Sequence, residues 1–291
     1  MDSSCVLAGV GGYYASNQGG LAGVFRRAAD GSDWKHVLSE LEAFTVFVHP
    51  RDPDLVFAGT ADGVYRSTDG GRNFRRADFP DSGVQVWSFL HDDADAKRML
   101  AGGSPVSIYR SEDAGASWKR MPDPQLPAHA KMPFSCRVMR LASNPRRRGE
   151  IFAVLEVSGV MRSTDGGESW GDCSADLLRL AQAEPRLRSK LLSDTEAEGM
   201  LDGHAVCISA ADPDSIIIAV RMGLFHSKIR ARPGRTCGST ASHRSPTGAT
   251  SRFRARIPAR SMPALALPPH RKTAPSTAAR TSARPGSAST R

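Results

Sequence analysis

Residues 228–291 of this chain contain no Asp or Glu, although they hold 14 of its 39 Lys and Arg residues. Residues 1–227 carry the other 25 basic side chains and all 30 acidic ones, so their formal net charge is −5. The overall charge of +9 therefore comes from one end of the chain. The body of the protein is mildly acidic, and its charge does not indicate a nucleic-acid-binding surface.

Other features are also missing. No segment approaches the ~20 apolar residues of a membrane-spanning helix, and the N-terminal stretch MDSSCVLAGVGGYYASNQGG lacks the basic and apolar regions of an export signal. The five cysteines form no Cys-x-x-Cys pair and show no zinc-ligand spacing with the eight histidines. We therefore expect a cytoplasmic protein with reduced thiols, no bound metal, no cofactor and no membrane partner.

The most informative feature that is present is an internal repeat. Residues 44–78, FTVFVHPRDPDLVFAGTADGVYRSTDGGRNFRRAD, contain four short runs rich in β-branched and aromatic residues, separated by Asp, Pro and Gly clusters typical of turns. The pattern returns from Val86, Val138 and Val206, and a shortened form occurs near the start at VLAGV and GLAGVFRRAADGSDW. This organisation predicts an all-β protein.

Repeated four-stranded sheets favour a β-propeller, because one small antiparallel sheet cannot bury both faces and must pack on its neighbours. A β-sandwich is the competing fold, but it would not require the same motif at the same hairpin of every unit. We predict a propeller of four-stranded antiparallel blades over residues 1–227 that forms an incomplete ring.

Each of the three clearest units carries the motif Ser-x-Asp-x-Gly-x-x-aromatic. Its members are Ser67, Asp69, Gly71 and Phe74; Ser111, Asp113, Gly115 and Trp118; and Ser163, Asp165, Gly167 and Trp170. Ser and Asp side chains can bond the backbone of their own turn, Gly allows positive φ, and the aromatic ring can cover the hairpin. These local roles make a structural interpretation of the aspartates preferable to a calcium site or a general acid.

Over about residues 4–227 the sequence resembles the Asp-box, or BNR, repeat family, which includes sialidases, the sortilin-type receptor domain and photosystem assembly factors. The resemblance implies a β-propeller whose Asp-boxes are stabilising turns away from the central site. An active sialidase would also need an Arg-Ile-Pro motif before the first box and a paired Tyr and Glu. Here Arg-Ile-Pro occurs only at 256–258, and none of the four tyrosines lies beside a suitable Glu.

The longest connection between repeats runs from Trp170 to His204 and contains a Leu-rich stretch interrupted by Pro185. It predicts a helical insertion at about 174–203. Asp194, Glu196 and Glu198 lie near its end, and two carboxylates at one pocket could act as acid and nucleophile in glycoside hydrolysis. We favour a solvated connector, because carboxylates gather in exposed loops and nothing in the sequence fixes their geometry.

Propellers bind ligands where the inner strands and their connecting loops meet the central channel. Four residues near the starts of predicted inner strands are candidates for this surface: Trp87, Arg137, Arg140 and His204. The arginines could recognise a carboxylate or phosphate, or could pack as ordinary strand residues. We expect a non-catalytic scaffold or a module that binds a protein, peptide or glycan, and the alternative is a glycoside hydrolase-like enzyme.

The repeat breaks off inside its motif at GLFHSKIRARPG, residues 223–234. Residues 228–291 are rich in Arg, Ala, Pro, Ser and Thr, which is typical of a disordered basic tail but also of GC-rich DNA read out of frame. After a one-base shift, KIRARPG permits Glu-Asp-Gln-Gly-Ala-Thr-Trp, which completes the motif begun at Ser227. KTAPSTAARTSARPG permits a second full box. We therefore interpret residues 228–291 as out-of-frame text and expect no nucleic-acid partner.

Sequencing the gene tests this interpretation. A one-base loss at or just after the Ser227 codon requires Lys228 to be AAG and both Pro233 and Pro285 to be CCT, because the recovered Asp and Trp residues need those third bases. Other third bases would contradict the frameshift and restore the basic tail as a candidate functional segment. Inserting one base should give a longer chain that unfolds more cooperatively.

Overall fold

A computed structural model describes residues 4–11, 21–29, 31–39, 41–229 and 241–242. The chain divides into two compact units, Met1–Ser245 and Pro246–Arg291. Everything below concerns the first unit. The second unit, with most of the proposed out-of-frame text, lies outside the described residues.

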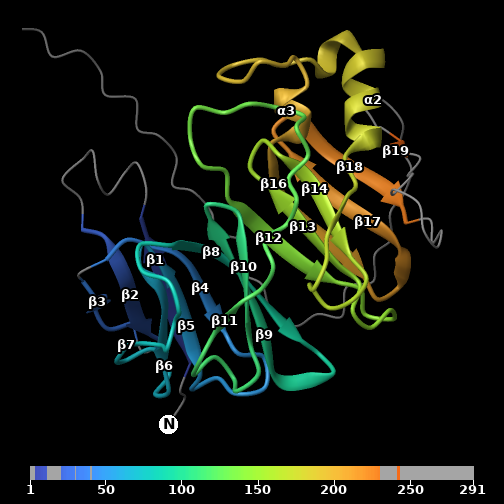
Figure 1. The fold of residues 1–291 in the computed structure, drawn as a ribbon. Helices are drawn as coiled ribbons and strands as arrows, with labels where there is room; N and C mark the ends of the chain where they lie inside the picture. Colours follow the sequence, from blue (N-terminus) through green and yellow to red (C-terminus); the bar gives the residue numbers. More distant parts are fainter. Residues whose placement is uncertain (1–3, 12–20, 30, 40, 230–240, 243–291) are drawn as a thin grey trace, which may run out of the picture. The chain divides into compact units, whose positions relative to one another are not determined.

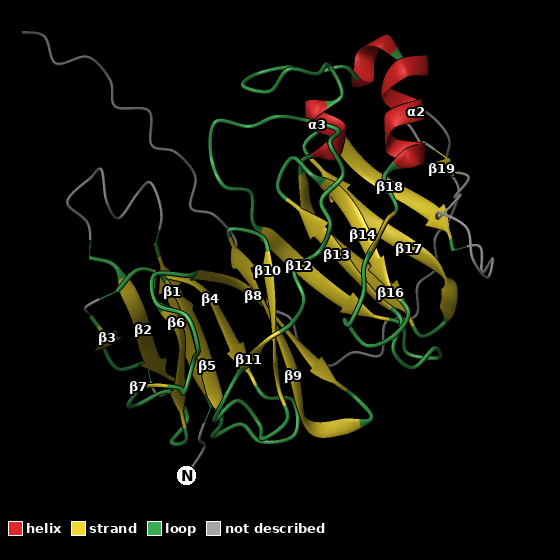
Figure 2. Cartoon of the chain, in the orientation of Figure 1, coloured by secondary structure: helices red, strands yellow, loops and turns green. Residues whose placement is uncertain are grey.

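The described strands form five antiparallel sheets, each with its strands in chain order (Figures 1 and 2). The N-terminal sheet has three strands, β1 (Cys5–Val10), β2 (Gly23–Ala28) and β3 (Lys35–Leu38). Four-stranded blades follow: blade 1 is β4 (Ala43–Val48), β5 (Val56–Thr60), β6 (Gly63–Ser67) and β7 (Arg75–Arg76); blade 2 is β8 (Gln85–Asp92), β9 (Asp95–Ser104), β10 (Ser107–Ser111) and β11 (Lys119–Arg120).

Blade 3 consists of β12 (Val138–Ser143), β13 (Ile151–Leu155), β14 (Gly159–Ser163) and β15 (Gly171–Asp172). Blade 4 consists of β16 (Gly203–Ser209), β17 (Asp212–Val220), β18 (Gly223–Lys228) and β19 (Ala241–Ser242). The first strands β4, β8, β12 and β16 pack against one another in sequence, as inner strands of a propeller do. The all-β propeller fold is thus confirmed, and the described blades form an incomplete ring.

The first strand of the N-terminal sheet, β1, has the position that the second strand has in a complete blade. β1 packs against β4 in the way that β5 packs against β8 and β13 against β16, so it has the place of a second strand. This agrees with the likeness between VLAGV of β1 and VFAGT of β5.

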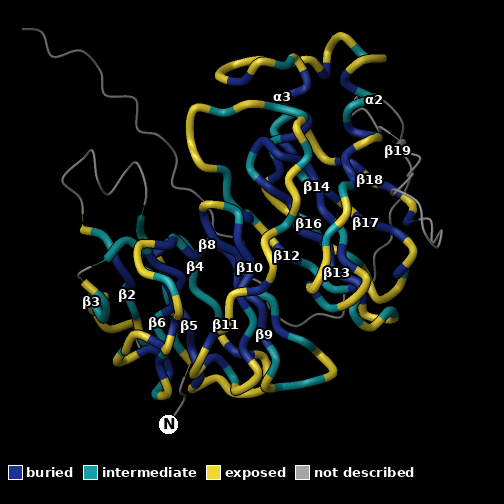
Figure 3. The backbone as a smooth tube through the Cα atoms, in the orientation of Figure 1, coloured by how far each residue is buried: buried dark blue, intermediate teal, exposed yellow. Residues whose placement is uncertain are grey.

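Buried residues follow the strands of each blade (Figure 3), and the apolar ones form clusters shared by neighbouring blades. Every residue of β5 and of β13 is buried, because these second strands lie inside their sheets and are covered on both faces. Gly59 allows a close approach, since a Cβ atom there would lie 2.4 Å from the Val86 carbonyl oxygen of blade 2. The packing of each blade on the next therefore supplies the core.

Helices interrupt the sheets between β15 and β16, as predicted (Figure 2). α2 (Ala175–Ala183) ends just before Pro185, which opens the short 3₁₀ helix η1 (Pro185–Leu187), and α3 (Glu198–Leu201) precedes β16. Leu177 and Leu201 join the core shared by blades 3 and 4. Within the described residues, no helix is long and apolar enough to cross a membrane.

The three motifs form the turns between the third and fourth strands of blades 1 to 3. In blade 1 the Ser67 hydroxyl donates to Asp69 Oδ1 at 2.7 Å and accepts the Gly71 N–H at 3.0 Å, while Asp69 Oδ1 accepts the Asn73 N–H at 3.0 Å. Burial works against ionisation, but hydrogen bonds from Ser67 and Asn73 outweigh it and hold the pKa of Asp69 well below its usual range. Equivalent bonds occur in the other two boxes.

The aromatic residue of each box folds back over its hairpin to a different depth. Trp118 is buried and its Nε1 donates to the Gly115 carbonyl at 3.2 Å. Trp170 makes the same bond to Gly167 but is half-buried, as is Phe74. The box aromatics therefore do not contribute equally to the core.

Ser227 stands in blade 4 where the box serines stand in the other blades. It pairs with Ile216 of β17 as Ser67 pairs with Val56. Its side chain is buried, and its hydroxyl has no hydrogen-bond partner among the described residues. Within the described part of the chain, Ser227 therefore has the position of a box serine without its hydrogen bonds.

Candidate functional site

The inner strands share a β-bulge close to their first residue. In all four blades the register of the first strand shifts by one residue relative to the second strand, and the extra residues are Phe44, Trp87, Met139 and His204. A bulge leaves one residue out of the hydrogen-bond ladder and re-aims its side chain. These four residues, here named the bulge row, therefore lie at the same end of neighbouring strands.

Three of the four predicted binding residues meet at the bulge row. The Phe44 and Trp87 rings stack with centres 4.2 Å apart and planes 12° apart. The Arg137 guanidinium carbon lies 4.2 Å from the centre of the Trp87 ring, in cation–π contact. Arg140 is exposed and donates to the Trp87 carbonyl oxygen at 3.3 Å. Trp87 Nε1 donates to the Gln85 side chain at 3.0 Å, which fixes the orientation of the ring.

Glu156 adds a carboxylate to this cluster. It follows β13 and lies 2.5 Å from Arg137 Nε, and its backbone N–H donates to the Arg137 carbonyl oxygen at 3.0 Å. Burial raises the pKa of Glu156, whereas Arg137 opposes the rise; the Asp202 carboxylate raises the pKa further and His204 lowers it. Sequence analysis did not identify Glu156. Its place was predictable, because it lies in the turn between the second and third strands of blade 3, and in an antiparallel sheet that turn lies at the end where the first strand begins.

His204 lies farther along the row, in blade 4. It is exposed, and its Nε2 lies 3.7 Å from Asp202 Oδ2. Asp202 also pairs with Arg221 Nε at 3.2 Å, and Arg221 reaches Glu198 at 2.8 Å. Ion pairs thus extend from Asp202 through Arg221 to Glu198 in the helical insertion.

Glu198 belongs to the interior of the insertion. It is almost fully buried, and its Oε2 accepts the N–H groups of Leu191, Leu192 and Ser193 at 2.7–2.9 Å. The Ser193 hydroxyl donates to the same oxygen at 2.7 Å. Burial alone would raise the pKa of Glu198, but the bonds from Ser193 and Arg221 outweigh it and hold the pKa far below its usual range. Glu198 is therefore an ionised group that organises the loop before α3.

The other two predicted carboxylates have different surroundings. Glu196 is exposed and lies 3.6 Å from Arg188. Asp194 is also exposed and accepts the Lys131 N–H at 3.0 Å, and this bond lowers its pKa. Each of the three carboxylates thus has its own set of partners. Among the described residues, no three His, Cys, Asp or Glu side chains are grouped so that they could hold a metal ion.

The architecture places the chain among β-propellers, and comparison with solved structures agrees. No protein-family model and no curated protein matches the chain. An ancestral GH74 enzyme is similar in structure, with a TM-score of 0.50 and 15% identity over 75% of this chain and 28% of its own. The GH74 enzyme of Niastella koreensis has a TM-score of 0.52 and 13% identity over 77% of this chain and 34% of its own.

YCF48 from Cyanidioschyzon merolae has a TM-score of 0.45 and 18% identity over 74% of this chain and 61% of its own. The present chain spans only about a third or less of the GH74 enzymes it resembles. At these identities the likeness shows the propeller fold alone.

Proposed function

We propose that the chain is a non-catalytic propeller module that binds a protein, peptide or glycan at the bulge row. The observation that supports this function most directly is the stack of Phe44, Trp87 and Arg137 across three blades. Aromatic rings and guanidinium groups are the side chains most enriched at binding hot spots. Glu156 and the exposed His204 add charged and hydrogen-bonding groups to the same end of the inner strands.

The carboxylates of the insertion favour binding over catalysis. A glycosidase needs one protonated and one ionised carboxyl group facing a shared substrate. Glu198 is held ionised, and its oxygens are occupied by hydrogen-bond donors of the protein itself. Glu196 faces solvent and Asp194 holds the Lys131 backbone. None of these arrangements supplies a proton to a glycosidic oxygen.

Glycoside hydrolysis is the alternative, and one observation favours it. Burial raises the pKa of Glu156, as a general acid requires, and the Asp202 carboxylate lies close enough to act in the same direction. Under this alternative the enzyme releases reducing ends from a glycan, and Glu156→Gln abolishes the reaction. Binding without any release of reducing ends supports the non-catalytic module.

Replacement of Trp87 with alanine is expected to weaken binding about fivefold or more, because truncation of a hot-spot aromatic residue costs over about 1 kcal/mol. Ligands from glycan and peptide arrays provide the test, with dissociation constants measured by calorimetry. Trp34→Ala is the matched control, because Trp34 is an exposed tryptophan in the connection before β3, outside the bulge row.

Two further measurements separate recognition from stability. Trp87→Phe keeps a ring against Phe44 and should retain most of the affinity, and the denaturation midpoint of each variant shows whether it is folded. A folded Trp87→Ala protein that binds as tightly as the Trp34→Ala control would contradict the proposed site.

A further inference from the structure

The last part of the helical insertion, residues 189–199, forms a compact closed loop, here named the leucine loop. The Ser189 N–H donates to the Glu196 carbonyl oxygen at 2.8 Å, and the Gly199 N–H donates to the Ser189 carbonyl oxygen at 3.3 Å. Inside the loop, the Glu198 carboxylate accepts the N–H groups of residues 191–193. The leucine loop is therefore braced by its own hydrogen bonds where it projects from the sheets between α2 and α3 (Figure 1).

Two neighbouring leucines of this loop point to solvent. Leu191 is 69% exposed and Leu192 is 64% exposed, because their N–H groups turn inward to Glu198 and their side chains turn outward. Among the large exposed apolar residues in the described ranges, they are the only two that are adjacent in sequence. Single apolar residues scattered on a surface are normal, whereas a pair held in place by a buried carboxylate is better explained by a partner that covers it.

Two lysines flank the leucine pair. Lys190 directly precedes it, and Lys131, from the connection between β11 and β12, donates its backbone N–H to Asp194 Oδ1 at 3.0 Å. That bond is the main cause of the low pKa of Asp194, and the charges of Lys131 and Lys190 lower the pKa further. Both lysines are exposed, and within the described part of the chain neither side chain forms an ion pair or hydrogen bond. The surface around the leucines therefore carries an excess of positive charge.

The leucine loop is joined to the bulge row by ion pairs. His204 of the row lies 3.7 Å from Asp202, which pairs with Arg221 at 3.2 Å. Arg221 in turn lies 2.8 Å from Glu198, the group that braces the loop. Because only these few side chains separate the two features, a partner bound at the bulge row can also reach the leucine loop.

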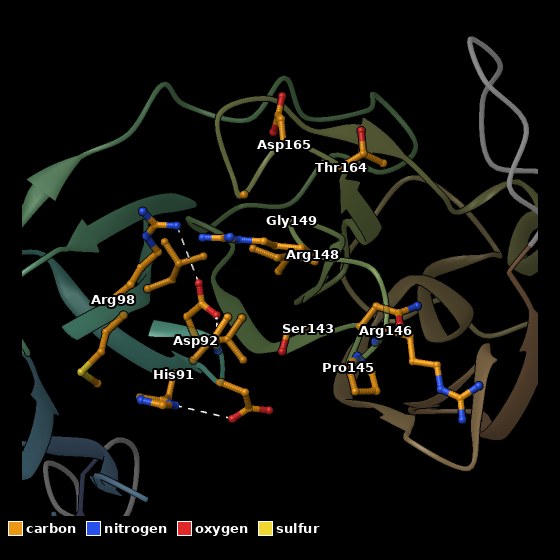
Figure 4. A pocket seen from close by; sticks show the side chains of 18 residues that line it. His91, Asp92, Arg98, Ser143, Pro145, Arg146, Arg148, Gly149, Thr164 and Asp165 are labelled. Carbon is orange, nitrogen blue, oxygen red and sulfur yellow. Dashed lines mark hydrogen bonds and ion pairs between the residues drawn. The ribbon is translucent and has the colours of Figure 1, made fainter. Parts of the chain in front are cut away.

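A cavity at the opposite end of the blades has a different character. It has a volume of about 440 Å³ and lies where β8 ends, so it is separate from the bulge row (Figure 4). Arginines and aspartates line it in equal number: Arg98, Arg146, Arg148, Asp92, Asp93 and Asp165. Figure 4 shows Arg98 directed at Asp92, and Arg98 also pairs with Glu112. The cavity thus has no excess of one charge to select a partner, in contrast to the leucine loop.

We propose that the leucine loop anchors a polypeptide partner, which covers Leu191 and Leu192 with apolar side chains and places Asp or Glu residues beside Lys131 and Lys190. A glycan fits this surface poorly, because leucine side chains cannot bond the hydroxyl groups they would cover. An anionic lipid surface is disfavoured by the 30 acidic against 25 basic residues of 1–227. The inference rests on the function proposed for the bulge row, and it narrows the partner to a polypeptide.

A library of random dodecapeptides displayed on phage provides the probe. Selected on the full chain, it should be enriched in peptides that combine Leu, Ile or Phe with Asp or Glu. Synthetic copies of the enriched peptides are then titrated with the full chain, and fluorescence anisotropy gives the dissociation constants.

Leu191→Ser and Leu192→Ser should each weaken binding of these peptides about fivefold or more, as truncation of an anchor residue does. Leu21→Ser is the matched control, because Leu21 is an equally exposed leucine, 68%, in the connection before β2. The two loop substitutions keep the backbone N–H groups that bond Glu198, so the variants should remain folded, which circular dichroism verifies.

The charge of the surface has its own test. Lys190→Gln should weaken the acidic peptides about threefold and make their binding less sensitive to salt, because an exposed charge pair contributes little and is screened. Lys119→Gln is the matched control, since Lys119 is an exposed lysine on β11 of blade 2. Equal affinity and equal salt dependence of the two variants would contradict the acidic character of the partner.

The inference is overturned if no enriched peptide binds Leu191→Ser and Leu192→Ser more weakly than Leu21→Ser. If Trp87→Ala alone weakens these peptides, the function proposed for the bulge row stands and only the role of the leucine loop fails. If none of the variants weakens them, both proposals fail. Co-sedimentation with phosphatidylserine vesicles that is lost in Leu191→Ser would assign the surface to lipid and would also overturn the inference.

Discussion

Trp118→Ala should lower the free energy of unfolding by about 3–5 kcal/mol, the usual cost of truncating a buried tryptophan. The Trp118 ring packs in the core between blades 1 and 2, with its centre 6.0 Å from Phe89 and 6.4 Å from Phe79. Its removal leaves a cavity in this core and breaks the bond to Gly115. Equilibrium denaturation in urea, monitored by circular dichroism, measures the change.

Trp170 provides a matched comparison within the same motif. Because its ring is only half-buried, Trp170→Ala should cost less than Trp118→Ala, in proportion to the smaller area lost from the core. If Trp118→Ala has the midpoint of the wild type, the aromatic residue of the box does not stabilise the blade in the way proposed. If the two variants are equally destabilised, burial does not determine the contribution.

The second large effect is expected for Glu198→Gln, which should reduce the free energy of unfolding by about 3–5 kcal/mol, as removal of one partner from a buried ion pair does. The amide cannot replace a carboxylate that accepts three backbone N–H groups and pairs with Arg221. Glu196→Gln is the control; Glu196 is exposed, and its contact with Arg188 should contribute less than about 1 kcal/mol. Equal effects of the two substitutions would contradict the structural role of Glu198.

Glu198 should also make stability depend on pH. Its pKa in the folded protein is depressed from the ordinary value of 4.5, so its ionised form stabilises the fold above that pH. As the pH falls below 4.5, the unfolded chain takes up a proton first and the stabilisation is progressively lost. The difference in unfolding free energy between wild type and Glu198→Gln should therefore shrink in acid. A difference that stays constant from neutral pH down to about pH 3 would contradict this account.

The blades and their box turns could be predicted from sequence because the determining interactions are local. Ser67, Asp69 and Gly71 lie within five residues and bond one another, so their spacing alone identifies the turn. The helical insertion was equally readable, since Pro185 ends α2 as a proline should. Trp87 and His204 were predicted near the starts of inner strands, and both are bulged residues at that end.

The remaining site residues depend on contacts between blades, which the pattern of one repeat does not encode. Phe44 joins Trp87 only because both strands bulge at the same register, and a bulge has no sequence signature here. Glu198 was assigned to a solvated connector, whereas the loop folds back and buries it.

Ser227 connects the structure with the interrupted repeat. A buried hydroxyl without a partner is unfavourable, and the Ser-x-Asp-x-Gly motif supplies partners to the equivalent serines. The shifted reading frame would provide the missing Asp and Gly directly after Ser227. The gene sequence remains the test of that prediction.

The shared bulge separates what holds the blades together from what they present to a ligand. A bulged residue is left out of the ladder, so its identity does not set the register of the strand. Phe, Trp, Met and His already occupy the four positions with the same backbone arrangement. Mutation at these positions can therefore alter recognition one blade at a time while the sheets keep their pairing, and a duplicated blade brings with it one new site for such variation.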